Sequence, residues 1–319
     1  MLIHKGKTMR KTSYVIIAAV LVVLIVAGVF TGIYLSNHTT SDTTSSGGVI
    51  QVVAAENFWG SLVFQLGGTR VNVLSIVTDP NADPHEYESN TADAIAIADA
   101  QLVIVNGAGY DDWALQLIAA SNTPHQVVLN VQELIGQTVG ANPHFWYSPT
   151  YVNETVNAMY QDLVSIDPSH TLYYTLQYAA LNASLAVYNG RIDEIRQDFA
   201  GAKVASTESI FVYLAAACNL DLVSPPAFME AIAEGNDPPA QSIVQFDNLI
   251  TNGTIVMLVY NEQTVTPLTN SIKLLAAQYN IPTVPVTETV QPKDVAFQVW
   301  MNAELLAIQN ALNQPALGS

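Results

Sequence analysis

The chain has 319 residues, of which 50% are hydrophobic and only 12% are charged, and its net charge is −17. This length leaves room for two lobes. The strong excess of acidic groups would repel the phosphate backbone of a nucleic acid, which argues against a nucleic-acid binder. The single cysteine, Cys218, excludes a disulfide framework within one chain, and its apolar neighbours predict a buried thiol.

The scarcity of ionic side chains suits an acidic medium, in which protonated carboxylates leave few charges and little self-repulsion. A merely acidic secreted protein explains the same composition equally well. Composition alone does not choose between these two interpretations.

The N-terminal segment predicts a membrane anchor. No charged residue occurs between Tyr14 and Leu35, a stretch long enough to span a bilayer. Four basic residues precede it and place the N-terminus in the cytoplasm and the rest outside: Lys5, Lys7, Arg10 and Lys11. We expect residues 1–35 to form an uncleaved single-pass anchor, with a cleaved signal as the alternative. Residues 36–48 are rich in Ser, Thr and Gly and predict a flexible linker.

From residue 49 onward, short apolar strands alternate with helical segments. Strands are predicted over residues 49–54, 71–77, 102–106 and 126–130. Helices are predicted over 57–66, over 91–98 with Thr91 as the cap, and over 111–120. This alternation is typical of a parallel sheet covered by helices on both faces, and it predicts a first lobe over residues 49–166.

A long helix is predicted to join this lobe to a second one. Ser148-Pro149 and Asp167-Pro168 both favour helix starts, and no further proline occurs up to Phe199. A helix of roughly 30 residues would be about 45 Å long, which is too long for a crossover within a small lobe. We therefore expect residues 167–200 to be a stiff connector.

The alternation then resumes, which predicts a second lobe of the same α/β class over residues 201–319. Its strands are expected over 203–206, 221–224, 254–260 and 283–286. Its helices are expected over 210–217, from Pro238-Pro239 to 250, over 266–279 and over 297–312.

Four side chains are expected at the carboxyl ends of these strands, where open parallel sheets bind ligands. His85 follows the strand at 71–77, His144 lies on a second Pro-containing loop, Glu208 follows 203–206 and Glu288 follows 283–286. Two imidazoles and two carboxylates would hold a divalent cation without net charge. Mixed nitrogen and oxygen ligands suit Mn²⁺, Fe²⁺ or Zn²⁺.

Four segments contain the candidate ligands: Asp83-Pro84-His85-Glu86-Tyr87-Glu88, Asn142-Pro143-His144-Phe145-Trp146, Ser206-Thr207-Glu208 and Thr287-Glu288-Thr289. These segments resemble the ligand motifs of the cluster A-I family, the metal receptors of zinc and manganese ABC importers, and the resemblance extends over about residues 49–312.

The resemblance implies a non-enzymatic solute-binding protein that delivers its metal to a membrane permease, and we expect a monomer. Glu208 stands where zinc receptors usually have histidine, which resembles the manganese-type members. Those members have Asp where Glu288 stands, and Asp294 is the alternative fourth ligand.

Other interpretations of these residues remain open. The histidines could be structural, Glu208 could cap the helix that begins near Ser209, and Glu288 could be a solvated loop residue. The metal centre could also activate water in a hydrolase, although no His-Glu-x-x-His or Gly-x-Ser-x-Gly motif occurs. A surface adhesin with a structural metal is a third alternative.

Overall fold

The computed structural model describes residues 48–81 and 83–314. The predicted anchor, residues 1–35, and almost all of the predicted linker lie outside the described residues. Within the described part of the chain, no helix is long and apolar enough to cross a membrane.

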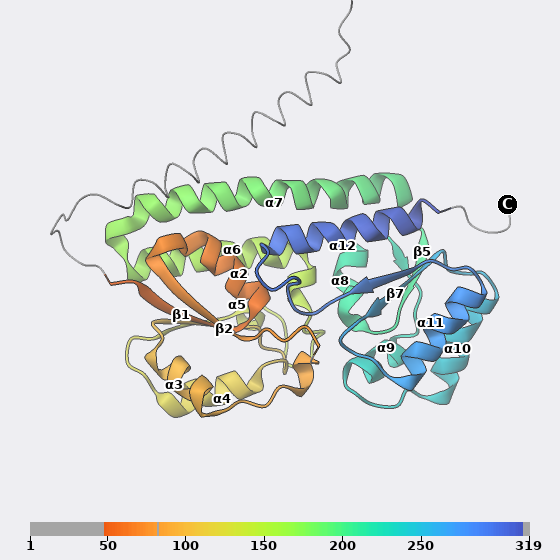
Figure 1. The fold of residues 1–319 in the computed structure, drawn as a ribbon, viewed down its shortest axis with the longest axis horizontal. Helices are drawn as coiled ribbons and strands as arrows, with labels where there is room; N and C mark the ends of the chain where they lie inside the picture. The colour runs from red at the N-terminus through yellow and green to blue at the C-terminus, as the bar shows by residue number, and fades with distance from the viewer. Residues whose placement is uncertain (1–47, 82, 315–319) are drawn as a thin grey trace, which may run out of the picture. The chain divides into compact units, whose positions relative to one another are not determined.

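The first sheet contains four parallel strands in the order β2-β1-β3-β4. The strands are β1 (Ile50–Glu56), β2 (Val71–Val77), β3 (Leu102–Val105) and β4 (Val127–Asn130). The helices α2 (Asn57–Gly67), α3 (Thr91–Asp99), α4 (Asp112–Ser121) and α5 (Val131–Leu134) connect or follow these strands. Figure 1 shows α2 on one side of this sheet and α3 and α4 on the other.

Alternate residues of β1 explain why both faces of the first sheet are covered. Val52 and Ala54 pack into one hydrophobic cluster together with α2 residues, whereas Val53 and Ala55 pack into another with Ile97 of α3. Successive side chains of a strand point to opposite faces, so an apolar run such as this one is stable only between two layers of helices.

The second sheet repeats the topology of the first, with parallel strands in the order β6-β5-β7-β8. Its strands are β5 (Lys203–Ser206), β6 (Asp221–Leu222), β7 (Met257–Asn261) and β8 (Thr283–Val286). Its helices are α8 (Val212–Ala217), α9 (Pro226–Ala233), α10 (Ala240–Thr251), α11 (Pro267–Gln278) and α12 (Phe297–Leu312). The predicted class of two similar α/β lobes with parallel sheets is therefore confirmed.

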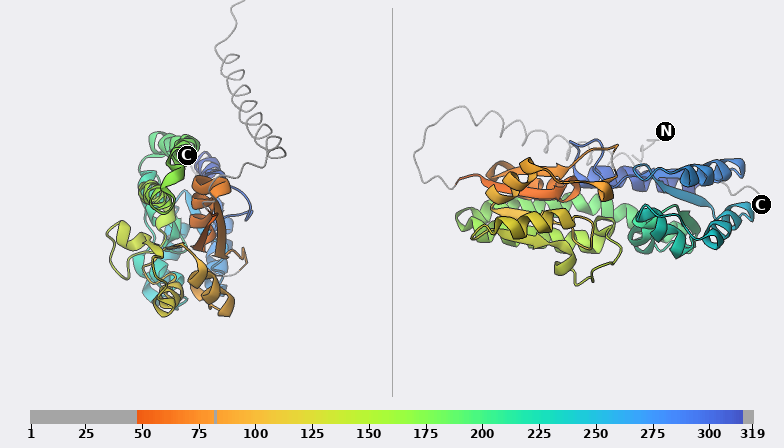
Figure 2. Two further views of the ribbon diagram at one scale, coloured as in Figure 1. Left: turned by 90° about the vertical axis from the view of Figure 1, so that its left-hand side faces the viewer. Right: turned by 90° about the horizontal axis from the view of Figure 1, so that it is seen from below.

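The predicted long helix is also confirmed. Helix α6 (Pro149–Ile166) begins after the cap Ser148, and a single 3-10 turn, η4 (Pro168–His170), separates it from α7 (Thr171–Phe199). The 29 residues of α7 extend about 43 Å at 1.5 Å per residue. Figures 1 and 2 show α7 and α12 running side by side, and the two helices contact each other.

The two lobes share one core. A single hydrophobic cluster contains Ile50 and Ile104 of the first sheet as well as Val204 of the second. The segment before α12 also bonds to α2, because the Asn57 side chain accepts from the Val290 N–H (2.9 Å) and donates to its carbonyl (3.3 Å). One hydrophobic cluster thus continues from the first lobe into the second. The lobe limits 49–166 and 201–319 therefore stay predictions.

Several local expectations differ from the structure. The cap of α3 is Asn90 and not Thr91, because the Asn90 side chain accepts from the Ala92 N–H while Asp93 accepts from the Asn90 N–H. This reciprocal arrangement satisfies two free donors of the first turn. Helices α5 and α9 were not predicted, and β7 begins three residues later than the strand expected from residue 254.

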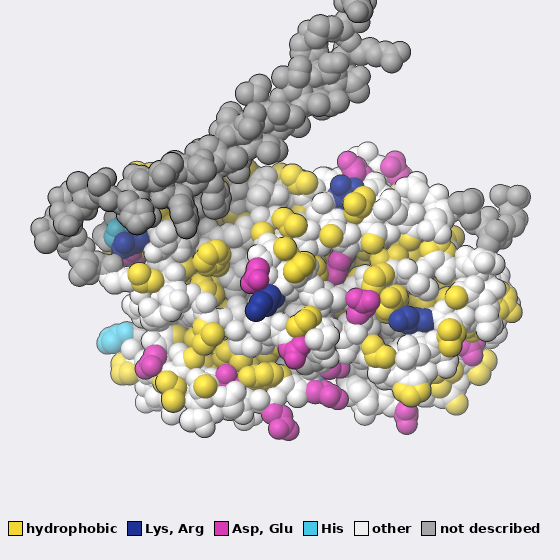
Figure 3. Space-filling model, viewed as in Figure 1, with side chains coloured by type: hydrophobic (Ala, Val, Ile, Leu, Met, Phe, Trp, Pro, Cys, Tyr) yellow, Lys and Arg dark blue, Asp and Glu magenta, His cyan; other side chains and the backbone are white. Residues whose placement is uncertain are grey.

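On the face drawn in Figure 3, the described surface is mostly uncharged, with carboxylates more numerous than Lys and Arg.

Candidate metal centre

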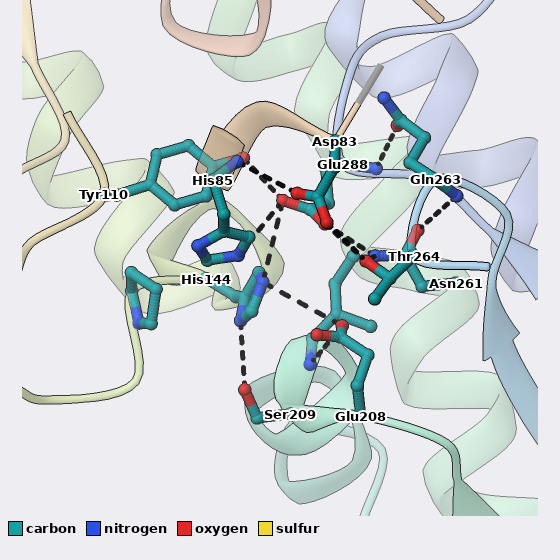
Figure 4. A network of polar contacts seen from close by, with 12 residues as sticks. Asp83, His85, Tyr110, His144, Glu208, Ser209, Asn261, Gln263, Thr264 and Glu288 are labelled. Atoms are coloured by element: carbon teal, nitrogen blue, oxygen red, sulfur yellow. Dashed lines mark hydrogen bonds and ion pairs between the residues drawn. The ribbon is translucent and has the colours of Figure 1, made fainter. Parts of the chain in front are cut away.

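Three of the four predicted ligands lie close together where strands of the two sheets end (Figure 4). One ligand atom each of His85, His144 and Glu288 lies within 4.8 Å of the others. Glu288 Oε2 is 3.4 Å from His85 Nε2 and 3.9 Å from His144 Nε2. Glu208 lies beside this group, with its Oε1 3.9 Å from His144 Nε2. Asp294, the alternative fourth ligand, is exposed and outside the group.

His85 is held by a short 3-10 turn, η2 (Pro84–Glu86), that follows β2. Asp83 caps this turn, because its Oδ1 accepts the His85 backbone N–H at 3.0 Å. The Tyr110 ring lies edge-on to the His85 imidazole, with ring centroids 4.7 Å apart. Proline at the first position and an acidic cap together fix the backbone from which the imidazole projects.

The tautomer of His144 follows from the hydrogen bonds of Asn142. The Asn142 Nδ2 donates to the Ser209 carbonyl (2.7 Å), which leaves its Oδ1 to accept from His144 Nδ1 (2.7 Å). The proton therefore resides on Nδ1, and the lone pair of Nε2 faces the site. Burial, and then the neighbouring His85, lower the pKa of His144 well below its usual value, which favours the neutral imidazole.

Glu208 combines a capping role with a position beside His144. Its Oε1 accepts from the Ile210 N–H (2.9 Å) at the start of the 3-10 turn η5 (Ser209–Phe211), as the capping interpretation expected. The side chain is fully buried. Burial, and then the charge of Glu288, raise the pKa of Glu208 well above its usual value.

Glu288 is a buried residue and not a solvated one. Its Oε2 accepts a hydrogen bond of 2.6 Å from the Tyr110 hydroxyl, and its Oε1 accepts one of 2.6 Å from Asn261 Nδ2. Two short hydrogen bonds from buried donors fix the plane of this carboxylate.

Tyr110 reaches Glu288 from a turn between β3 and α4. The Asp111 carboxylate accepts from the backbone N–H groups of Asn106 (2.5 Å) and Gly107 (2.7 Å), which closes the turn. Gly107 has a φ of +77°, and a Cβ there would lie 2.5 Å from the Asn130 side chain, so only glycine fits. Burial raises the pKa of Asp111 to about 6.

Three buried polar atoms of this site have no hydrogen-bond partner among the described residues: His85 Nε2, His144 Nε2 and Glu208 Oε2. Buried polar atoms are nearly always paired. All three are electron-pair donors, and a divalent cation would satisfy them together. The chemistry of this donor set therefore fits a metal ion.

Aromatic rings exclude water from the inner side of the site. Trp146 is fully buried, stacks on Phe58 with centroids 3.9 Å apart and lies edge-on to His144 at 5.2 Å. An apolar surrounding strengthens the attraction between an ion and its carboxylate ligands.

An acidic cavity of about 600 Å³ lies on the outer side, next to Asp83 and Gln263. The described residues that line it come from both lobes and include no Lys or Arg, so the cavity attracts cations. Its carboxylates are Asp79, Asp83, Glu86, Glu88 and Glu262.

Sequence reasoning did not single out Asn142, Tyr110 or Asn261 as contributors to this site. Asn261 carried a usable signal, because it is a polar residue at the carboxyl end of an apolar strand. Two further histidines among the described residues lie outside this site. His125 is exposed, and His170 pairs with Asp167 at 2.7 Å beside the start of α7.

The sequence and the fold are similar to those of known metal-binding proteins. The family model described as the periplasmic zinc-uptake complex component A, ZnuA, matches residues 52–311. The manganese-binding lipoprotein MntA of Halalkalibacterium halodurans is 30% identical over 137 residues, which cover 41% of this chain and 45% of the relative. The iron-binding protein YfeA of Yersinia pestis is 25% identical over 191 residues, which cover 57% of this chain and 60% of that protein. The chain thus spans about half the length of the curated relatives it matches.

Among solved structures, the periplasmic zinc-binding protein TroA of Treponema pallidum has the same fold. Its TM-score is 0.70 at 16% sequence identity, and the similarity covers 84% of this chain and all of TroA. The resemblance that the two histidine motifs indicated is confirmed, since the family match extends over both lobes. The chain belongs to the ZnuA family, the cluster A-I solute-binding proteins, which are not enzymes.

Proposed function

We propose that this protein is an extracytoplasmic receptor that captures a divalent transition metal ion and delivers it to an ABC-type permease. The cargo is Mn²⁺ or Zn²⁺, with Fe²⁺ compatible with the same donor atoms. The proposed ligands are His85 Nε2, His144 Nε2, Glu208 Oε2 and Glu288 Oε2. One observation carries the proposal: three buried donor atoms have no hydrogen-bond partner among the described residues and lie beside the hydrogen-bonded Glu288 carboxylate.

The charges support binding of a divalent cation. Two carboxylates neutralise the ion, and burial favours the neutral form of His144, whose bond to Asn142 leaves Nε2 facing the site. Burial and the charge of Glu288 raise the pKa of Glu208. A cation favours the ionised form of a carboxyl group, so we expect metal ions and protons to compete at Glu208.

The position of the site between two sheets supports capture by closure. The first lobe supplies His85 and His144, and the second supplies Glu208 and Glu288. The ion would draw these loops together, and contact with the permease would separate them again. The bonds between Asn57 and Val290 restrict this motion to a small one. We further propose that residues 1–35 anchor the protein as a monomer in the cell membrane with the domain outside.

Burial of the ligands also speaks against the alternative of a metal-dependent hydrolase. His144, Glu208 and Glu288 are fully buried, with aromatic rings behind them. A catalytic zinc normally keeps one coordination position open for water or substrate. Four protein ligands around the ion would leave no such position.

Elemental analysis and native mass spectrometry of the full-length protein in detergent test this proposal. We expect one transition metal ion per chain in the wild-type protein and in the control His125→Ala, whose side chain is exposed. We expect His144→Ala to lose tight binding and keep its circular dichroism spectrum. Wild-type affinity in His144→Ala would refute the site. Unfolding on metal removal would favour the adhesin with a structural ion.

A further inference from the structure

Both oxygens of Glu288 accept hydrogen bonds, and the two residues that donate them are nearly as buried as Glu288 itself. Tyr110 is 4% exposed and Asn261 is 2% exposed. Asn261 is fixed in turn, because its Oδ1 accepts from the Gln263 N–H (2.9 Å) and its Nδ2 lies 3.0 Å from Thr264 Oγ1. The amide therefore cannot turn away from Glu288 without breaking further hydrogen bonds.

The two oxygens of Glu288 face different surroundings (Figure 4). Oε2 faces both imidazoles, at 3.4 and 3.9 Å from their Nε2 atoms. Oε1 faces Asn261 and Thr264 of the second lobe. An ion held by the two imidazoles thus meets Oε2. Chelation by both oxygens would require Glu288 to rotate and give up its bond to Asn261.

Glu208 is restricted in the same way. Its Oε1 accepts the Ile210 N–H, which leaves Oε2 as the atom without a partner among the described residues. Glu208 and Glu288 can therefore each bind the ion through Oε2, while Oε1 keeps its hydrogen bond to Ile210 or Asn261 of the second lobe. With two imidazoles, the protein supplies four ligand atoms.

We propose that Asn261, with the support of Tyr110, is a specificity-determining residue that holds Glu288 as a one-oxygen ligand. This inference rests on the proposed function and refines it. A closed set of four nitrogen and oxygen ligands matches the tetrahedral coordination of Zn²⁺. Mn²⁺ prefers six ligands that are mostly oxygen. The site therefore disfavours Mn²⁺ by withholding the second oxygen of Glu288.

The test compares Zn²⁺ and Mn²⁺ dissociation constants, by chelator competition, in full-length wild-type protein and Asn261→Leu. Leucine has a similar volume and donates no hydrogen bond. Zn²⁺ binds most nitrogen and oxygen sites more tightly than Mn²⁺, so the informative quantity is the change in their affinity ratio. We expect Asn261→Leu to shift this ratio at least tenfold toward Mn²⁺. The double variant Tyr110→Phe/Asn261→Leu should shift the ratio by at least as much as Asn261→Leu alone.

Tyr87→Phe is the matched control. Tyr87 also donates a hydroxyl bond near the His85 loop, but to Asp93 (2.8 Å) and not to Glu288. We expect an unchanged ratio in this variant. A shift in Asn261→Leu no larger than that in Tyr87→Phe would overturn the inference.

X-ray absorption of the Zn²⁺-loaded wild-type protein needs no variant and decides the question if Asn261→Leu does not fold. Four nitrogen and oxygen neighbours at about 2.0–2.1 Å would support the inference, and five or six protein neighbours would refute it. Failure of the wild-type protein to bind either metal would overturn the proposed function and this inference with it. An unchanged affinity ratio in a metal-binding protein would overturn this inference alone.

Discussion

Glu304 of α12 is expected to make the protein less stable as the pH rises. The carboxyl group is buried between the two ligand-bearing loops, where Tyr147 donates its hydroxyl to Oε2 (2.7 Å) and the Thr287 N–H donates to Oε1 (3.0 Å). Burial outweighs these hydrogen bonds and raises the pKa of Glu304 from 4.5 to about 8. The folded protein therefore holds a proton that the unfolded chain releases at lower pH.

The sign of the effect follows from this difference in proton binding. The folded state binds the proton more tightly, so the stabilisation is complete below pH 4.5 and is lost as the pH rises to about 8. At 1.36 kcal/mol per pH unit, the difference between the two pKa values gives a ceiling of about 5 kcal/mol in the free energy of unfolding. Burial also raises the pKa of Glu56, which adds to the loss in the same direction.

Chemical denaturation of metal-free wild-type protein and Glu304→Gln between about pH 4.5 and 8.5 isolates this contribution. Glutamine keeps a neutral hydrogen-bonding group at the position and cannot titrate. We expect the stability advantage of the wild-type protein over Glu304→Gln to shrink by several kcal/mol across this range. A difference between the two proteins that is constant with pH would show that Glu304 is ionised throughout, and the reasoning would fail.

Three further perturbations follow from the structure. Asn142→Ala removes the acceptor that fixes the His144 tautomer, and we expect metal affinity to fall about 10–100-fold in equilibrium dialysis; a change below about threefold would contradict the role of Asn142. A saturating metal ion at 100 times its Kd should raise the free energy of unfolding by about 2.7 kcal/mol, which calorimetry with and without chelator can measure. Asn90→Ala removes the α3 cap and should destabilise the protein by about 1 kcal/mol in urea titrations, whereas Thr91→Ala should not.

The strands and the positions of the candidate ligands could be predicted because both depend on short-range patterns. Residues 71–77, 203–206 and 283–286 are short segments that contain valine and are each followed by a threonine, and the structure has strands at those residues. In a parallel sheet the chain must bring the ends of all strands to one edge. This rule placed His85 at the carboxyl edge of the first sheet and Glu288 at the carboxyl edge of the second. That the two residues lie near each other depends in addition on how the two sheets face each other.

The partners of these ligands could not be predicted in the same way, because they depend on contacts between lobes. Tyr110 lies in the first lobe and bonds to Glu288 in the second, and no local pattern pairs the two. The hydrophobic core shared by the two lobes also depends on contacts between the lobes, so no local pattern predicts it. The cap of α3 was misassigned for a local reason, since Asn90 and Thr91 are both good capping residues and only the bond to Asp93 distinguishes them.

The bonds from residues 290–298 to α2 have a consequence for biosynthesis. Ser61 accepts from the Phe297 N–H (3.0 Å), and Gln65 bonds to Gln298, so a helix made early is completed by a segment made more than two hundred residues later. In a nascent polypeptide this segment is still missing. Part of the apolar surface of the first half therefore stays exposed to solvent until residues 290–298 have been synthesised. Burial of that surface, and with it the completion of the fold, therefore depends on a segment that is synthesised late.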